Sequence, residues 1–198
     1  RISDQGRMIG FMEPVKIDGN PARQNIFVQE LKGSEPIGEP RRVTAEHQRD
    51  IAEYFWKGDE TVIYAKDVNG DENYHVFTLN VATGEQRDIS PFEKIQATLT
   101  GISRSHPEEV LIGMNDRDPQ WHDLYRVNLT SGTRTLVERN DQSFRSYVTD
   151  GDFTPRLATR AREDGGFGTT ERVLVGCDAD GWPLKASRQG IARPKLPT

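Results

Sequence analysis

The sequence has almost no sulfur chemistry and no long apolar run. Its 198 residues include one cysteine, Cys177, which excludes an internal disulfide framework and a zinc site built from several cysteines. No apolar stretch approaches the roughly 18 residues that a membrane-spanning helix needs, so no membrane partner is expected. The basic and then apolar leader of a secretory signal peptide is also missing.

An excess of positive charge is missing as well. Lys and Arg number 26 against 31 Asp and Glu, so the formal net charge is −5. Proteins that bind nucleic acids usually carry a basic face, so no nucleic-acid partner is expected. Because the chain begins at Arg1 and is already strand-like by Met8, we interpret it as a segment of a longer protein, so the missing leader does not decide the compartment of that protein.

What the sequence does have is many turns and short alternating runs. Gly (18) and Pro (11) are frequent, and hydrophobic residues make up only 34%. Apolar residues recur mostly with a period of two, which predicts strands. The expected strands are Met8–Met12, Asn25–Val28, Thr61–Ala65, His75–Leu79, Glu109–Gly113, Asp123–Val127, Thr135–Val137, Pro155–Ala158 and Arg172–Val175. Only Thr44–Tyr54 has a helical pattern, and we expect at most one helical turn there.

An internal repeat organises these strands. Residues 76–85 read VFTLNVATGE and residues 124–133 read LYRVNLTSGT, a spacing of 48, and TVIY at 61–64 matches EVLI at 109–112 with the same spacing. Weaker copies precede and follow. The pattern predicts an all-β chain, a partial β-propeller of about four four-stranded antiparallel blades. The expected blades are residues 1–44, 45–92, 93–140 and 141–198.

Two stretches resemble a known family. Residues 64–75 (YAKDVNGDENYH) and 103–132 (SRSHPEEVLIGMNDRDPQWHDLYRVNLTSG) are similar to blade hairpins of the prolyl oligopeptidase family of serine peptidases, in its bacterial dipeptidyl-peptidase-like and acylaminoacyl-peptidase-like branches. The resemblance implies an N-terminal, non-catalytic propeller that limits access of short peptides to a C-terminal α/β-hydrolase domain. The Ser, Asp and His of catalysis would belong to that domain, which this sequence does not include.

The resemblance also defines the expected partners. These are the hydrolase domain and short peptides, in a bacterial protein of the cytoplasm or periplasm, with no cofactor. Cutting a propeller exposes strand edges, which can pair with another chain, so self-association is a further expectation. The alternative is a TolB-like propeller that acts as a protein-binding scaffold. A carbohydrate-binding or lyase propeller is a third reading.

No catalytic or metal site is expected in this segment. The nearest approach to a Gly-x-Ser-x-Gly nucleophile motif surrounds Ser103 and lacks the second glycine. The four histidines have no metal-ligand spacing: they are His47, His75, His106 and His122. We expect His122 to be a turn residue, either solvated or hydrogen-bonded. The cluster Asp67, Asn69, Asp71 and Glu72 departs from a calcium-binding loop and fits a hairpin turn at Asn69–Gly70 better.

The candidate substrate-binding residues are Arg117 and Trp121. They lie in the segment NDRDPQW, residues 115–121, which we expect to be a loop joining two strands. The Arg117 guanidinium could clamp a peptide carboxylate, and Trp121 could form an apolar wall. The alternative is a loop ion network of Arg117 with Asp116 or Asp118 and a Trp121 that packs in the blade. Trp56 and Trp182 are expected at blade cores or rims, and Cys177 as a structural thiol.

Overall fold

The described part of the computed structural model is built from strands alone. It comprises residues 1–68, 70–161 and 170–174, with fourteen strands and no helix within those ranges. No helix of this part could therefore cross a membrane. Cys177 and Trp182, together with the predicted turns at Asn69 and at residues 164–166, lie outside the described residues.

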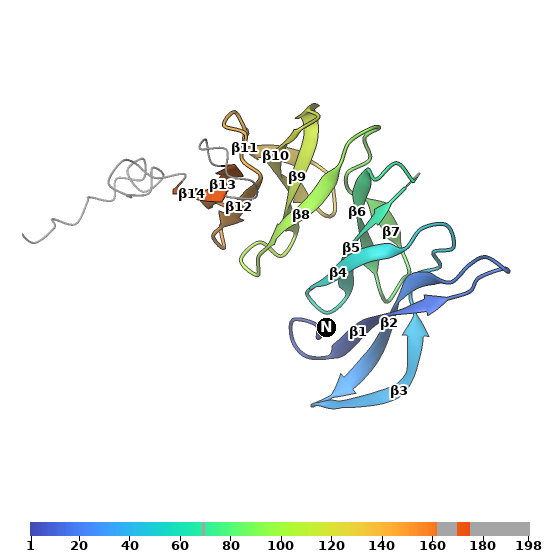
Figure 1. The fold of residues 1–198 in the computed structure, drawn as a ribbon. Coiled ribbons are helices and arrows are strands. Elements are labelled where there is room, and N and C mark those ends of the chain that lie inside the picture. Colours follow the sequence, from blue (N-terminus) through green and yellow to red (C-terminus); the bar gives the residue numbers. More distant parts are fainter. Residues whose placement is uncertain (69, 162–169, 175–198) are drawn as a thin grey trace, which may run out of the picture.

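The strands form four antiparallel sheets that follow one another along an arc (Figure 1). In each sheet the spatial order equals the sequence order, which is a meander. The sheets are β1 (Met8–Val15), β2 (Arg23–Lys32) and β3 (Glu35–Arg42); β4 (Ile51–Lys57), β5 (Thr61–Asp67), β6 (Tyr74–Asn80) and β7 (Gln86–Asp88); β8 (Ala97–Ile102), β9 (Glu109–Asp118), β10 (Trp121–Asn128) and β11 (Arg134–Glu138); β12 (Ser146–Thr149), β13 (Pro155–Ala161) and β14 (Thr170–Leu174). The expected propeller architecture is confirmed.

Buried side chains of a central strand point alternately to the two faces of its sheet, which explains why the sheets stack. In β5, Val62 and Tyr64 belong to a buried cluster with Ile26 of the first sheet. Ile63, between them, belongs to a second cluster with Ile112 of the third sheet. Successive side chains of a strand point to opposite faces, so one strand supplies apolar contacts to both neighbouring blades. A single blade could not bury both faces alone.

The 48-residue repeat is visible in three dimensions as a repeated turn. The side-chain oxygen of Asn80 accepts the backbone N–H groups two and three residues later, at 2.9 Å each. That of Asn128 does the same at 3.0 and 2.8 Å. Gly84 (φ 77°) and Gly132 (φ 73°) complete the turns, and each N–H bonds the carbonyl of its asparagine at 2.8 Å. Equivalent residues thus build equivalent hairpins in neighbouring blades.

The positive φ of Gly84 leads to a first prediction. An added Cβ at Gly84 would meet no atom within 4 Å, but the φ of Gly84 is +77°, which L residues rarely adopt. Gly84→Ala should therefore destabilise the chain by about 1 kcal/mol, through backbone strain alone. Gly151→Ala is the matched control, because Gly151 has no positive φ and its nearest contact would be at 3.8 Å. Urea unfolding of both variants tests this. Equal losses would contradict the role of φ.

The helical turn expected in Thr44–Tyr54 is wrong. Residues 51–57 form β4, and residues 44–50 contain no helix. A register shift between Ile51 and Glu53 places the buried residues of β4 at 51, 54, 56 and 57, which interrupts the strict alternation by which a strand is recognised in sequence. Thr44 does not cap a helix, since its hydroxyl donates to Asn25 Oδ1 at 3.0 Å.

The terminal sheets differ from the expected four strands. The first has three strands plus an isolated bridge from Ile2 to Ile9, and the last has three within the described residues. Every sheet lies inside one of the four ranges expected from the repeat, and we propose those ranges as the blades. Trp56 is buried, as expected. All eight residues of the edge strand β3 are exposed, and self-association through such edges stays a prediction.

Candidate functional site

Arg117 is bound to a buried carboxylate. Its Nε and Nη2 atoms donate to the two oxygens of Asp123, at 2.8 Å each, and Nη2 also donates to the Asn140 carbonyl at 3.0 Å. Asp123 is 2% exposed. Burial acts to raise the pKa of Asp123, but the hydrogen bonds from Arg117 and from the Asn140 N–H outweigh it, and the pKa is lowered. Asp123 in turn raises the pKa of Arg117.

The segment carrying Arg117 and Trp121 is a hairpin and not the open loop that we expected. Residues 115–118 extend β9, and Trp121 begins β10, where it pairs with Asp118. The alternative, an ion network around Arg117, forms with other partners than Asp116 or Asp118: Arg117 bonds Asp123, and a 3.7 Å contact reaches Asp141. Asp118 contributes only electrostatic attraction at longer range. Trp121 is half-buried. Within the described residues, no hydrogen bond or ion pair joins Arg117 to Trp121.

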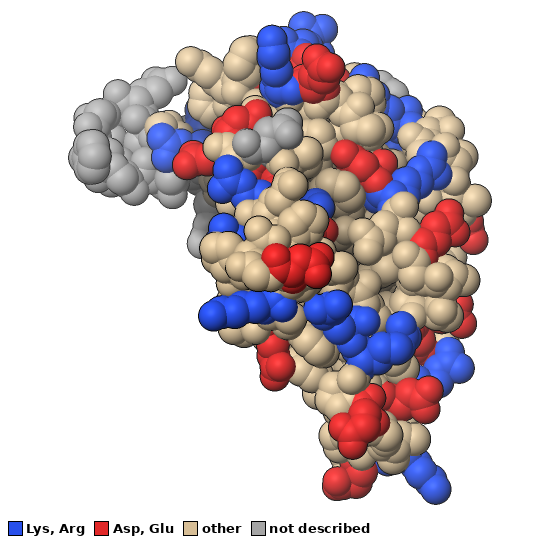
Figure 2. Space-filling model, turned by 90° about the vertical axis from the view of Figure 1, so that its right-hand side faces the viewer, with Lys and Arg blue, Asp and Glu red and all other residues tan. Residues whose placement is uncertain are grey.

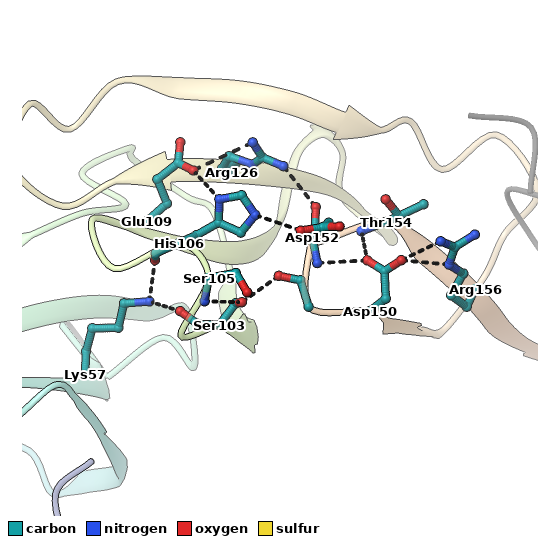
Figure 3. Close-up of polar contacts among 11 residues, drawn as sticks. Lys57, Ser103, Ser105, His106, Glu109, Arg126, Asp150, Asp152, Thr154 and Arg156 are labelled. Atoms are coloured by element: carbon teal, nitrogen blue, oxygen red, sulfur yellow. Dashed lines mark hydrogen bonds and ion pairs between the residues drawn. The ribbon is translucent and has the colours of Figure 1, made fainter. Parts of the chain in front are cut away.

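A second polar site, which the sequence did not indicate, lies where blades two, three and four meet (Figure 3). Lys57, at the end of β4, donates to the carbonyls of Ser103 and His106 in the next blade, at 2.6 Å each. Lys57 is 7% exposed, and this burial lowers its pKa, while Asp4 and Glu109 act in the opposite direction. A buried ammonium therefore holds the β8–β9 loop to the second blade.

His106 links the third blade to the fourth in the same network (Figure 3). Its Nδ1 lies 3.3 Å from Glu109 Oε2 and its Nε2 lies 3.4 Å from Asp152 Oδ1. The ring stacks on Phe153 with centroids 5.1 Å apart. Arg126 donates to the Asp152 carbonyl at 3.0 Å and lies 3.7 Å from Glu109. The arrangement joins two blades by charge and by aromatic packing.

The serine closest to a nucleophile motif is engaged in blade packing. The Ser103 hydroxyl donates to the Gly151 carbonyl of the fourth blade and accepts the Ser105 N–H at 3.1 Å. Its oxygen thus closes a turn and joins two blades. Among the contacts of the described residues, none pairs this hydroxyl with a histidine ring.

The remaining candidates are placed as follows. In the described ranges, no group of three or more His, Cys, Asp or Glu side chains could hold a metal ion. Asp67 accepts the Gly70 N–H at 2.8 Å, and Gly70 has a φ of 82°, which is a turn geometry. His75 pairs with Asp88 at 2.7 Å. His122 is not a turn residue but lies within β10, with Nε2 buried.

Charges of both signs are interspersed over the face of the molecule in Figure 2. Elsewhere among the described residues, part of the charge forms ion pairs. Arg134 pairs with Asp116 at 2.7 Å, and Arg156 pairs with Asp150 at 2.6 Å. Both pairs join residues of one blade.

The chain is similar to peptidases and to TolB proteins. It is 44% identical over 137 residues to dipeptidyl aminopeptidase BIII of Pseudoxanthomonas mexicana, covering 69% of this chain and 20% of that protein. The structure of prolyl oligopeptidase B from Galerina marginata matches with a TM-score of 0.51 and 16% identity, over 81% of this chain and 20% of that one. That of a putative TolB from Agrobacterium tumefaciens matches with a TM-score of 0.54 and 14% identity, over 91% and 61%.

These matches agree with the arrangement of the blades. No protein-family profile matches the chain. The two structural matches establish the propeller fold. The aminopeptidase match establishes the family to which this propeller belongs. The chain spans about a fifth of that aminopeptidase. It is a region of the N-terminal β-propeller of the prolyl oligopeptidase family.

Proposed function

We propose that this chain is part of a propeller that limits access of peptides to an α/β-hydrolase domain of the same protein. The observation that carries the proposal is the 44% identity with a dipeptidyl aminopeptidase over 137 residues. The parent protein would then be a serine peptidase, and this region its non-catalytic part.

Hydrogen bonds between blades support the proposal, because they hold neighbouring blades in a fixed arrangement. One arginine crosses each blade boundary and donates to a backbone carbonyl of the next blade: Arg41 to Val81, Arg87 to Thr130 and Ser131, and Arg126 to Asp152. Hydrogen bonds from charged donors are stronger than neutral ones. Because these contacts recur at each boundary, the blades resist separation, which is the property that a filter for substrate size requires.

Arg117 and Trp121 remain proposed peptide contacts. The bonds of Arg117 to Asp123 and Asn140 use Nε and Nη2, which leaves Nη1 as the edge for a ligand carboxylate. About a third of the side chain is exposed. A ligand carboxylate would therefore bind through Nη1 alone, more weakly than in the bidentate clamp expected from the sequence.

The test is the length selectivity of the full-length protein that contains this chain. We expect it to hydrolyse chromogenic dipeptidyl amides and to reject long unfolded peptides. Arg87→Met removes the two bonds across the boundary between blades two and three. It should raise kcat/KM several-fold for the long peptides and leave the dipeptidyl amides unchanged. Arg42→Met, in the exposed strand β3, is the matched control.

The same experiment separates the alternative. A scaffold of the TolB kind is the alternative, since TolB and peptidase propellers both match this chain in fold. If the full-length protein hydrolyses no peptide amide, the peptidase proposal is wrong and the scaffold gains support. If Arg87→Met leaves the length selectivity intact, the filter role in particular is contradicted.

A further inference from the structure

Among the described residues, the boundary between blades three and four buries less apolar surface than the other two boundaries. One cluster of nine buried apolar residues joins the first blade to the second, and another cluster of nine joins the second to the third. The clusters between the third and fourth blades contain three residues and two. Because apolar burial is the main force that holds stacked sheets together, this boundary is the weakest of the three.

The same boundary holds most of the buried polar atoms that make no hydrogen bond. The described residues contain six such side-chain atoms, and four of them lie here: His106 Nε2, His122 Nε2, Arg126 Nε and Tyr147 Oη. His122 and Arg126 lie on the same face of β10 as Leu124, which packs against the fourth blade. The other two atoms belong to β2, in the first blade.

These unpaired atoms favour separation of the two sheets. A buried polar group without a hydrogen bond has lost its contacts with water and has gained no partner in exchange, which is costly. His106 Nε2 has partial compensation from the Asp152 carboxylate, at 3.4 Å. Separation would let water reach all four atoms, and this gain would offset part of the cost of exposing apolar side chains.

The β12–β13 turn, residues 150–153, closes the boundary. Ser103 and Arg126 of the third blade donate to two backbone carbonyls of this turn (Figure 3). The Phe153 side chain, 1% exposed, packs in one cluster with Leu111 and Leu124. The φ of Phe153 is 59°, a conformation that is an outlier for a bulky residue. Backbone strain of this kind persists only where surrounding contacts hold it in place.

The turn is braced internally, and a chain connection lies at the other end of β12. Asp150 accepts the N–H groups of Asp152 and Thr154, at 3.0 and 2.9 Å, and the Arg156 guanidinium at 2.6 Å. The chain passes from the third sheet to the fourth at residues 139–145, before β12 begins. One end of β12 is therefore tied to blade three by the chain itself, and the other end by non-covalent contacts.

We propose that blade four swings away from blade three, with residues 139–145 as the hinge and the turn 150–153 as the closure. In the open state the Phe153 side chain leaves its cluster, and water reaches the unpaired polar atoms. The first three blades keep their fixed arrangement. The opening depends only on these contacts, but its role rests on the proposed function: a gap between two blades would admit peptides that the closed propeller excludes.

Thiol labelling of the full-length protein that contains this chain tests the opening. Leu111→Cys and Ile112→Cys are each made together with Cys177→Ser. Both positions are 0% exposed in β9, but Leu111 faces blade four and Ile112 faces blade two, so each variant controls for the other. Relative to the same variant in urea, position 111 should react at least about tenfold faster, the effect of relieving one unpaired buried group. Mass spectrometry of the peptide that contains each cysteine measures the rates, and equal rates would overturn the proposal.

A reversible cross-link tests the role of the opening. A Cβ on Gly151 would lie 3.8 Å from Ser103 Oγ, within reach of a disulfide between Ser103→Cys and Gly151→Cys. Oxidation should lower kcat/KM several-fold for the longest peptides that the reduced protein cleaves, and leave dipeptidyl amides unchanged. The reduced form of the same protein is the matched control. Equal cleavage by both forms would contradict the role in access. Absence of any hydrolysis would contradict the proposed function, while the labelling rates would still decide whether the boundary opens.

Discussion

Asp123→Ala is expected to destabilise the chain by about 3 kcal/mol, the range for losing one partner of a buried, hydrogen-bonded charge pair. Asp123 is 2% exposed and accepts hydrogen bonds at 2.8 Å from Arg117 Nε, from Arg117 Nη2 and from the Asn140 N–H. The substitution leaves the donors of Asn140 and Arg117 without their acceptor at the end of the β9–β10 hairpin. Urea unfolding at pH 7 measures the loss.

The effect of Asp123→Ala should depend on pH in a defined direction. The folded pKa of Asp123 is lowered from an unfolded value of about 3.9. Its stabilisation is therefore complete above the unfolded pKa and is lost as pH falls through the folded pKa. The difference between the two proteins should stay constant above about pH 5 and shrink in more acid solution. A difference that grows on acidification would contradict this assignment.

Asp141→Ala is the matched control. Asp141 belongs to the same cluster, 3.7 Å from Arg117 and 2.9 Å from Arg139, but its side chain is 60% exposed. Exposed ion pairs contribute little, so the loss should be about 0.5 kcal/mol or less. Equal losses in the two variants would show that burial of Asp123 does not determine its contribution.

Ile112→Ala should cost about 3 to 4 kcal/mol, the usual range for a large aliphatic residue removed from a full core. Ile112 is 0% exposed and lies in the cluster that joins blades two and three. Its neighbours come from strands of both blades, so the cavity cannot close by moving one strand. Guanidinium unfolding followed by circular dichroism measures the change.

Leu136→Ala provides the comparison for Ile112→Ala. Leu136 lies in the edge strand β11 and is 50% exposed, so its truncation should change stability by less than about 1 kcal/mol. Ile112→Val, which removes one methyl group, should cost about 1 kcal/mol. A small effect of Ile112→Ala would mean that the contact between the two blades is not a tightly packed core.

The strands predicted most completely from sequence, together with their repeat, are those that pack on a neighbour at both faces. β5, β6, β9 and β10 have β-branched and aromatic residues in continuous runs, and both their location and their repeat were predicted. β3 was missed because all its residues are exposed and it has no apolar pattern. β4 was misinterpreted because a bulge changes the spacing of its buried residues.

The candidate site was less predictable, because its contacts cross strands. Arg117 cannot readily pair with Asp116 or Asp118 on an extended strand, since adjacent side chains point to opposite faces. Its partner, Asp123, lies across the hairpin, and this pairing becomes evident only once residues 115–118 are recognised as strand. The Lys57 contacts span 46 and 49 residues, and no local pattern encodes such a distance.

The meander order of the sheets has a consequence for the speed of folding. Every ladder in the described structure joins strands that are consecutive in the chain, so each pairing closes only a short loop, and short loops lose little entropy on closure. The asparagine turns at 80–84 and 128–132 form bonds within four residues and can nucleate their hairpins independently. Local contacts of this kind correlate with rapid folding, whereas contacts between blades, such as those of Lys57 across 46 and 49 residues, are not local. The hairpins can therefore form before the blades meet, and the slower step is the docking of one preformed blade on the next.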